Sequence, residues 1–354
     1  MDVGVCDTCD NDVKVHEGPV VTARGLYEVR EIAQALVEVG RGLTYTDAAR
    51  RVRTGYWGPD GTGRLHGDAS GQTVADWVGQ FAPVLGDEMD EKEWPETLVL
   101  DSTEFQWTNP RTGTPQQLFC VLAAWGYPAG DPKGRLWRVE ARPTDRNTHW
   151  EAFLGALEGK PTSVVCDRDL AIIGGVQRRW GKSGKKAVPI HQCEHHLYIN
   201  ARKALGKDDI SKFGHPTLEA LKDAFKSPAG WEGFAAAVNA DPSATNGQRW
   251  VKHWDRRMRV QTQRRSTLPP HYSTGALEPR IRDVRQMLER RRWTFRNRDR
   301  MNQLLGLARL RLNRQDDPRA YAAILRQHLD DNGGKPARSR RSLHDRRGDY
   351  SLRP

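Results

Sequence analysis

The middle of the chain alternates short β-prone runs with helical patterns in an order that admits few folds. Three β-prone runs come first, then a helical segment, a fourth run, a second helical segment and a fifth run. We expect strands at 97–100, 118–125, 136–141, 163–166 and 187–191, and helices at 149–157 and 171–180. This β-β-β-α-β-α-β order predicts an α/β domain in which helices cover a mixed sheet.

Two of the expected strands end in an aspartate. The run LVL is followed by Asp101, and the run VVC is followed by Asp167. If these strands are neighbours in one sheet, both carboxylates emerge at the same edge, within reach of common divalent cations. Such a pair suits phosphoryl transfer by two metals, one for the attacking oxygen and one for the leaving oxygen. Asp169 competes with Asp167 for this role, and a turn or helix cap is the alternative interpretation of either residue.

Two further motifs follow in the chain. Cys193 and His196 form a Cys-x-x-His element directly after the fifth strand. Being three residues apart, they would share one face of a helix and could brace the following segment against the sheet, or supply half of a zinc site. The motif STGALE then ends in Glu278, which opens a basic helical segment. A third carboxylate therefore follows the two aspartates.

This order of motifs resembles the mutator-like superfamily of DDE transposases, which includes related bacterial insertion-sequence transposases. The resemblance covers roughly residues 97–312. It implies a ribonuclease-H-like mixed sheet with an all-helical insertion, in which Asp101, Asp167 and Glu278 are the catalytic metal ligands. Two Mg²⁺ ions are the implied cofactors, with Mn²⁺ as a substitute. It implies a structural role for the Cys-x-x-His element. Pro279 suits the first helical turn and would put Glu278 at the N-cap.

The implied activity is metal-dependent nicking of mobile-element ends, followed by attack of the freed 3′ hydroxyl on target DNA. DNA would be the partner, and cutting two ends together calls for a homodimer or a larger assembly. The following arginines are expected to hold phosphates: Arg280, Arg282, Arg285, Arg290, Arg291 and Arg292. The alternative is a transposase-derived DNA-binding protein without catalysis. A nuclease of the same fold is disfavoured, because 111 positions separate Asp167 from Glu278.

Charge is distributed unevenly along the chain. The net charge is +11, and residues 251–354 carry 27 Lys and Arg against 11 Asp and Glu, whereas residues 1–93 carry 9 against 17. The excess of positive charge predicts a polyanionic partner and a basic surface in the C-terminal third. A solvated helix face is the alternative explanation for such a charge run.

The N-terminal part is expected to hold smaller elements. Cys6 and Cys9 have the spacing of one half of a zinc ribbon, which would bind Zn²⁺ only with further ligands; His16 could be one, and the rest would have been lost or would lie upstream. Helical patterns in 21–86 suit a helix-turn-helix or a small helical bundle. The predicted organisation is a ribbon-like segment (1–20), that helical domain, an acidic linker (87–96), the catalytic core (97–196 with 273–312), the helical insertion (197–272) and a basic tail (313–354).

Composition limits where the chain would work. The five cysteines form an odd set without the spacing of a secreted scaffold, so reduced thiols or metal ligands are expected. No apolar run approaches the roughly 20 residues of a membrane helix, and the first residues are acidic and polar rather than signal-like. We therefore expect a cytoplasmic protein that does not bind membranes.

Overall fold

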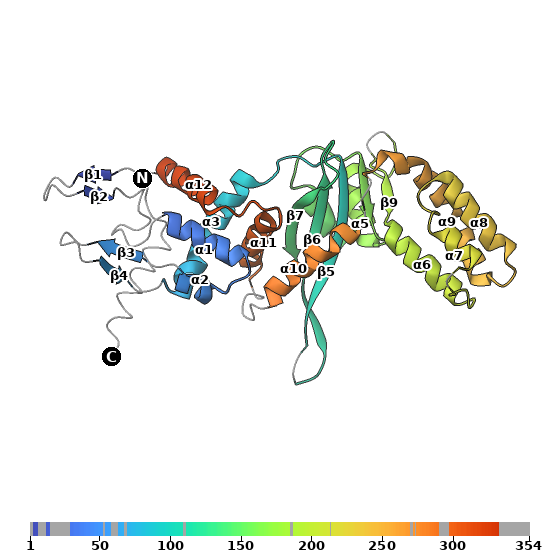
Figure 1. Cartoon of the computed structure of the whole chain (residues 1–354), viewed down its shortest axis with the longest axis horizontal. Helices are drawn as coiled ribbons and strands as arrows, with labels where there is room; N and C mark the ends of the chain where they lie inside the picture. Colours follow the sequence, from blue (N-terminus) through green and yellow to red (C-terminus); the bar gives the residue numbers. More distant parts are fainter. Residues whose placement is uncertain are drawn as a thin grey trace. The chain divides into compact units, whose positions relative to one another are not determined.

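In a computed structural model the chain forms two compact units. Figure 1 shows their helices and strands. One unit comprises Glu91–Arg138 and Arg142–Ile281, and the other comprises Met1–Asp90, Val139–Ala141 and Arg282–Pro354. The division after Asp90 falls inside the predicted acidic linker. The structure describes residues 3–5, 12–14, 29–51, 54–57, 63–66, 69–108, 111–184, 187–212, 214–269, 272, 274–289 and 297–332. Within these residues, no helix has the length and apolar character needed to cross a membrane.

A five-stranded mixed sheet forms the centre of the 91–281 unit. Its strands are β5 (Thr97–Thr108), β6 (Pro115–Tyr127), β7 (Arg135–Arg142), β8 (Ser163–Cys166) and β9 (Ile190–Gln192), in the spatial order β7-β6-β5-β8-β9. β5 pairs with β6 antiparallel and with β8 parallel, and β8 pairs with β9 parallel. The predicted α/β class and the order of the elements are confirmed.

Two helices, α4 (Asn147–Leu154) and α5 (Leu170–Trp180), pack against each other and against the sheet core. Their contact is close because α5 carries glycine where it crosses α4: a Cβ on Gly175 would lie 2.2 Å from the Cβ of Trp150. The core between sheet and helices is apolar, and its largest members include Trp94, Leu98, Leu122, Trp150, Phe153, Val164 and Trp180.

The first strand is longer than the apolar run that predicts it. We expected this strand to end at residue 100, but β5 continues to Thr108 and stays paired with β6. Phe105 and Phe119 are register partners whose rings stack at 4.7 Å, which helps to hold the extension together although most of its other residues are polar. Figure 1 shows this β5–β6 hairpin extending past the other strands of the sheet.

Four helices follow the last strand and form a separate apolar core within the same unit. They are α6 (Glu194–Gly206), α7 (Pro216–Leu221), α8 (Pro228–Ala240) and α9 (Thr245–Arg264), as Figure 1 shows. Their buried core is rich in aromatic residues and includes Phe225, Trp231, Phe234 and Trp254. The described residues of this segment contain helices and no strand.

The other unit contains a bundle of five helices: α1 (Val29–Gly40), α2 (Tyr45–Arg51), α3 (Gly71–Met89), α11 (Arg298–Leu312) and α12 (Pro318–Asp331). α1 contacts α11 and α12, and α3 contacts α2 and α11. Two short hairpins are also described, namely β1 (Val3–Val5) with β2 (Asp12–Lys14), and β3 (Thr54–Trp57) with β4 (Gly63–His66).

The bundle corrects two of the predicted boundaries. We expected residues 273–312 to belong to the sheet domain and 313–354 to be a basic tail, but α11 and α12 are members of this bundle. The reason is that α11 buries residues on several sides, including Met301, Leu304, Leu305, Leu307, Ala308 and Leu310. The guanidinium of the buried Arg309 also pairs with the carboxylate of Asp90, at the end of α3.

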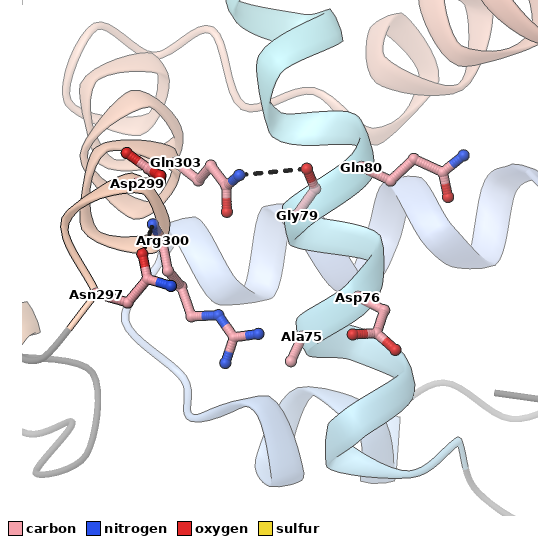
Figure 2. Close-up of a pocket in the computed structure, with 8 residues that line it drawn as sticks. All are labelled: Ala75, Asp76, Gly79, Gln80, Asn297, Asp299, Arg300 and Gln303. Atoms are coloured by element: carbon pink, nitrogen blue, oxygen red, sulfur yellow. Dashed lines mark hydrogen bonds between the residues drawn. The ribbon is translucent and has the colours of Figure 1, made fainter. Parts of the chain in front are cut away.

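A polar surface pocket of about 350 Å³ lies between α3 and α11 in this bundle (Figure 2). The Gln303 amide donates to the Gly79 carbonyl at 3.2 Å beside it, and the Asn297 side chain caps α11 by accepting from the Arg300 amide. None of the predicted catalytic carboxylates lines this pocket.

Candidate active site

The two predicted aspartates lie at the same edge of the sheet. The parallel ladder between β5 and β8 ends at the pair Val99 and Val165. Asp101 and Asp167 each lie two residues past this last pair, so both follow the point where the strands separate. Asp167 follows the end of β8, as predicted, whereas Asp101 lies within β5 because that strand continues along β6. Together the two strands bring both carboxylates to one edge.

Electrostatic interactions connect Asp101 to the third predicted carboxylate. The pKa of Asp101 is raised to about 7, chiefly by burial and in smaller part by the negative charges of Asp167, Glu278 and Asp169, while a hydrogen bond from the Ser102 amide acts in the opposite direction. Glu278 is the first residue of α10 (Glu278–Glu289), one position inside the helix rather than at the expected N-cap. The charges of Asp167 and Glu278 therefore act on Asp101, although the three carboxylates come from distant parts of the sequence.

The carboxylates do not form a finished metal site. In the part of the chain that the structure describes, no three His, Cys, Asp or Glu side chains form a group that could hold a metal ion. Glu278 is exposed, whereas Asp101 and Asp167 are partly buried. Oxygen ligands of this kind suit Mg²⁺, and the mutual repulsion that raises the Asp101 pKa is what a bound cation would relieve. The donor chemistry thus fits Mg²⁺, and the side chains would have to converge on it.

Asp167 and Asp169 differ in what their carboxylates do. Asp169 is the N-cap of α5, where its side chain accepts hydrogen bonds from the amides of Ala171 (2.6 Å) and Ile172 (3.4 Å). Asp167 accepts from the Asp169 amide at 2.9 Å. Because a helix cap is a structural task that removal of the carboxylate would disturb, Asp167 is the better candidate for a ligand.

A further carboxylate, Asp145, lies beside this group and was not predicted. It accepts hydrogen bonds from the Ser102 hydroxyl and from the Trp150 indole. Burial raises its pKa, and Asp169 raises it further by charge repulsion and a side-chain hydrogen bond. Asp145 precedes α4 in a loop, and in the sequence it is indistinguishable from an ordinary polar loop residue.

The Cys-x-x-His element is tied to the start of the STGALE motif. Cys193 is the buried N-cap of α6, and its sulfur lies 3.0 Å from the Thr274 hydroxyl. The same hydroxyl lies 3.2 Å from Nδ1 of His196. Thr274 has no exposed surface and precedes Glu278 by one helical turn. These contacts agree with a structural role for Cys193 and His196, because the pair contacts the segment that carries Glu278.

Other contacts hold the same two segments together. Glu194 accepts a hydrogen bond from the Tyr272 hydroxyl and pairs with Arg265 at 2.9 Å. The Gln261 side chain donates to the Gln192 carbonyl (2.8 Å) and accepts from the Gln192 amide (2.9 Å), which ties the end of α9 to β9. The start and the end of the helical insertion are thus both anchored at the sheet.

His191, in the middle of β9, is buried among these contacts. Its exposed fraction is 2%. Burial, together with the positive charges of Arg264 and Arg265, lowers the pKa of His191 to about 4. The imidazole is therefore neutral at physiological pH, and protonating it would place an unpaired charge in the interior.

The predicted phosphate-binding arginines are only partly described. The Arg280 guanidinium lies 5.7 Å from the centre of the Trp125 ring, Arg282 is exposed, and Arg285 pairs with Glu289 along α10 at 2.8 Å. Arg290, Arg291 and Arg292 lie outside the described residues, as do Cys6 and Cys9 of the predicted zinc site.

Comparisons with known proteins do not identify the chain. No protein-family model matches its sequence, and no curated protein matches it.

Proposed function

We propose that the chain is a DNA transposase of the DDE class, built on a ribonuclease-H-like core. The observation that carries the proposal is the electrostatic group of Asp101, Asp167 and Glu278, which joins β5, the end of β8 and the start of α10. The order of strands and helices and the mixed sheet agree with such a core. The contact between Thr274 and the Cys-x-x-His element adds support, because it contributes to the position of Glu278.

The reaction would consist of two in-line displacements at phosphorus. Water attacks a phosphodiester at an element end, a new P–O bond forms as the bond to the 3′ oxygen breaks, and a 3′ hydroxyl is freed. That hydroxyl then attacks a phosphodiester of target DNA, whose own 3′ oxygen leaves, so no covalent bond to the protein is needed. Two Mg²⁺ ions held by Asp101, Asp167 and Glu278 would activate the attacking oxygen and stabilise the leaving oxygen.

The surrounding residues would orient the carboxylates. The Ser102 amide donates to Asp101 at 2.9 Å, which fixes one carboxylate oxygen on the sheet. Glu278 is exposed at a helix start, and its side chain would have to turn toward the sheet edge when a cation binds. Arg280 follows it in the same helical turn, where its guanidinium would neutralise a phosphate of the bound strand.

A second candidate is a DNA-binding protein without catalysis. The observation that favours it is that the carboxylates do not form a group ready to hold a metal ion in the described residues. A DNA-reading helix in the N-terminal bundle gains no support, because α3 contains no lysine or arginine to contact phosphates. Either candidate would bind DNA, so cation binding and cleavage distinguish them.

The test uses the full chain and two measurements. MgCl₂ or MnCl₂ should raise the melting temperature of the wild type, since a ligand that binds only the folded state stabilises it. The same cations should support nicking of supercoiled plasmid DNA. Asp101→Asn should lose both effects, while Glu104→Gln, an exposed carboxylate on the same strand, should keep them. If the wild type binds plasmid but shows neither cation stabilisation nor nicking, the non-catalytic candidate replaces the transposase.

A further inference from the structure

Helix α9 of the insertion separates its buried residues from its charged residues. One face packs into the aromatic core of the insertion through Val251, Trp254 and Met258. The opposite face is exposed and mostly basic, with most of its charged side chains three or four residues apart and the exposed Val260 among them. Its basic members are Arg249, Lys252, His253, Arg256, Arg257 and Arg264. We call these six residues the α9 basic face.

The α9 basic face is only weakly neutralised by its surroundings. Arg249, Lys252 and Arg256 form no ion pair with any other residue that the structure describes. Asp255 is the acidic residue of this helix, and it pairs with Arg259 at 2.9 Å beside the face. Like charges three or four residues apart destabilise a helix. The row of positive charges therefore lowers the stability of α9. A contribution to the stability of the fold does not explain why these charges are present.

One tryptophan connects this face with the sheet edge that carries the carboxylates. Arg168 lies between Asp167 and Asp169, is exposed, and has its guanidinium 5.3 Å from the centre of the Trp254 ring. The Arg257 guanidinium lies 5.7 Å from the centre of the same ring. A guanidinium at such a distance from an indole is attracted by the ring. The positive charge of α9 therefore continues, through Arg257 and Arg168, to the residues next to Asp167.

We infer that the α9 basic face binds the sugar-phosphate backbone of DNA and leads it to the carboxylates of the sheet edge. The inference rests on the proposed function. Arg168 joins the α9 basic face to the candidate catalytic residues, and this sets the direction in which the DNA would run. From Arg249 to Arg264 the helix spans roughly 22 Å, given a rise of about 1.5 Å per residue. One strand of a duplex presents a phosphate about every 3.4 Å of its axis, so several phosphates fit along this face.

DNA is the occupant that this arrangement favours. An acidic peptide would match the charge, but only a phosphodiester chain would be both bound by α9 and presented to a phosphodiester-cleaving site. The contacts are with phosphates, so we expect binding that does not depend on base sequence. This surface differs from the arginines of α10, because it belongs to the insertion and is ordered by the insertion's own core.

The test is the salt dependence of DNA binding by the full chain. The probe is a short fluorescein-labelled duplex of arbitrary sequence, and its affinity is measured by anisotropy over a series of KCl concentrations. A plot of log affinity against log salt has a negative slope. The combined change Arg249→Gln, Lys252→Gln and Arg256→Gln should make this slope less steep by about 2 to 3, since each lost phosphate contact removes about 0.9. Glutamine favours helix, so the circular dichroism of this variant should match that of the wild type.

A control variant removes the same number of positive charges elsewhere in the same unit. Arg178→Gln, Lys222→Gln and Lys226→Gln remove side chains that pair with Glu151, Glu219 and Asp223 respectively. The slope for this control should stay close to that of the wild type. If both variants change the slope equally, the effect comes from net charge alone and the α9 basic face is not a binding surface.

The two proposals fail in different ways. If the α9 variant loses salt-dependent binding while no cation-dependent, Asp101-dependent nicking is found, the α9 surface stands and the transposase proposal fails. If nicking depends on Asp101 but the α9 variant binds with the wild-type slope, the transposase proposal stands and the α9 surface is refuted. Comparison with single-stranded RNA of the same length tests the choice of DNA, and tighter binding of RNA would overturn it.

Discussion

Thr274 offers the sharpest test of how the insertion is joined to the sheet. Its hydroxyl contacts Cys193 Sγ at 3.0 Å and His196 Nδ1 at 3.2 Å, and the residue has no exposed surface. Thr274→Val keeps the shape of the side chain and removes both contacts. A buried polar group left without its partner costs about 1–3 kcal/mol. Because the thiol is a weak hydrogen-bonding group and His196 is only half-buried, we expect a loss at the low end, about 1 kcal/mol, mostly from the imidazole.

The assay is urea unfolding followed by tryptophan fluorescence, which reports mainly on the 91–281 unit because most of the twelve tryptophans lie there. Thr267→Val is the matched control. Its hydroxyl donates to the Arg264 carbonyl at 2.8 Å in an exposed position, so the change should cost less than about 0.5 kcal/mol. Equal midpoints for the two variants would refute the reasoning. Thr274→Val should also weaken cation-dependent nicking, because Glu278 lies one helical turn further along.

Three further predictions concern the same unit. His191 has a folded-state pKa of about 4, below its unfolded value, so its contribution to stability is present above about pH 6.5 and is lost as the pH falls toward 4. The stability difference between wild type and His191→Gln, measured in urea, should therefore shrink by about 3 kcal/mol over that range, and a constant difference would contradict it. Gly175→Ala should lower the melting temperature, since the new Cβ would lie 2.2 Å from the Trp150 Cβ and overpacking costs about 1–3 kcal/mol. Gly233→Ala, in open space on α8, should raise stability by up to about 1 kcal/mol, and a lower melting temperature there would contradict the helix argument.

The order of elements in the sheet domain could be predicted because each buried strand is an apolar run between polar segments. β8 was predicted at its observed bounds, since all four of its residues are buried. The end of β5 could not be predicted in this way. Its second half is mostly polar, and it remains a strand because β6 stays paired with it as far as Thr108, with one register shift between Phe105 and Gln106. Pairing between strands depends on a second segment of the chain, so the alternation of hydrophobic residues within one strand does not predict it.

The candidate site was predictable only where a motif marks it. Asp101 and Asp167 follow apolar runs, and Glu278 ends a recognisable motif, so the sequence could name all three as candidates. Asp145 has no such mark, because its place beside Ser102 and Trp150 depends on how a loop meets the sheet. The membership of α11 in the N-terminal bundle was missed for a similar reason: its apolar residues show that it is buried, but not against which partner.

The contacts of the Thr274 hydroxyl also show that the two ends of the helical insertion lie close together. They bring together positions 193 and 274, which are 81 residues apart, so the chain leaves the sheet and returns to it at almost the same point. A segment with neighbouring ends can change in length at small cost, because the entropy of closing a loop grows only with the logarithm of its length. The helical segment between these positions could therefore become longer or shorter in related proteins, while the strands of the sheet keep their pairing.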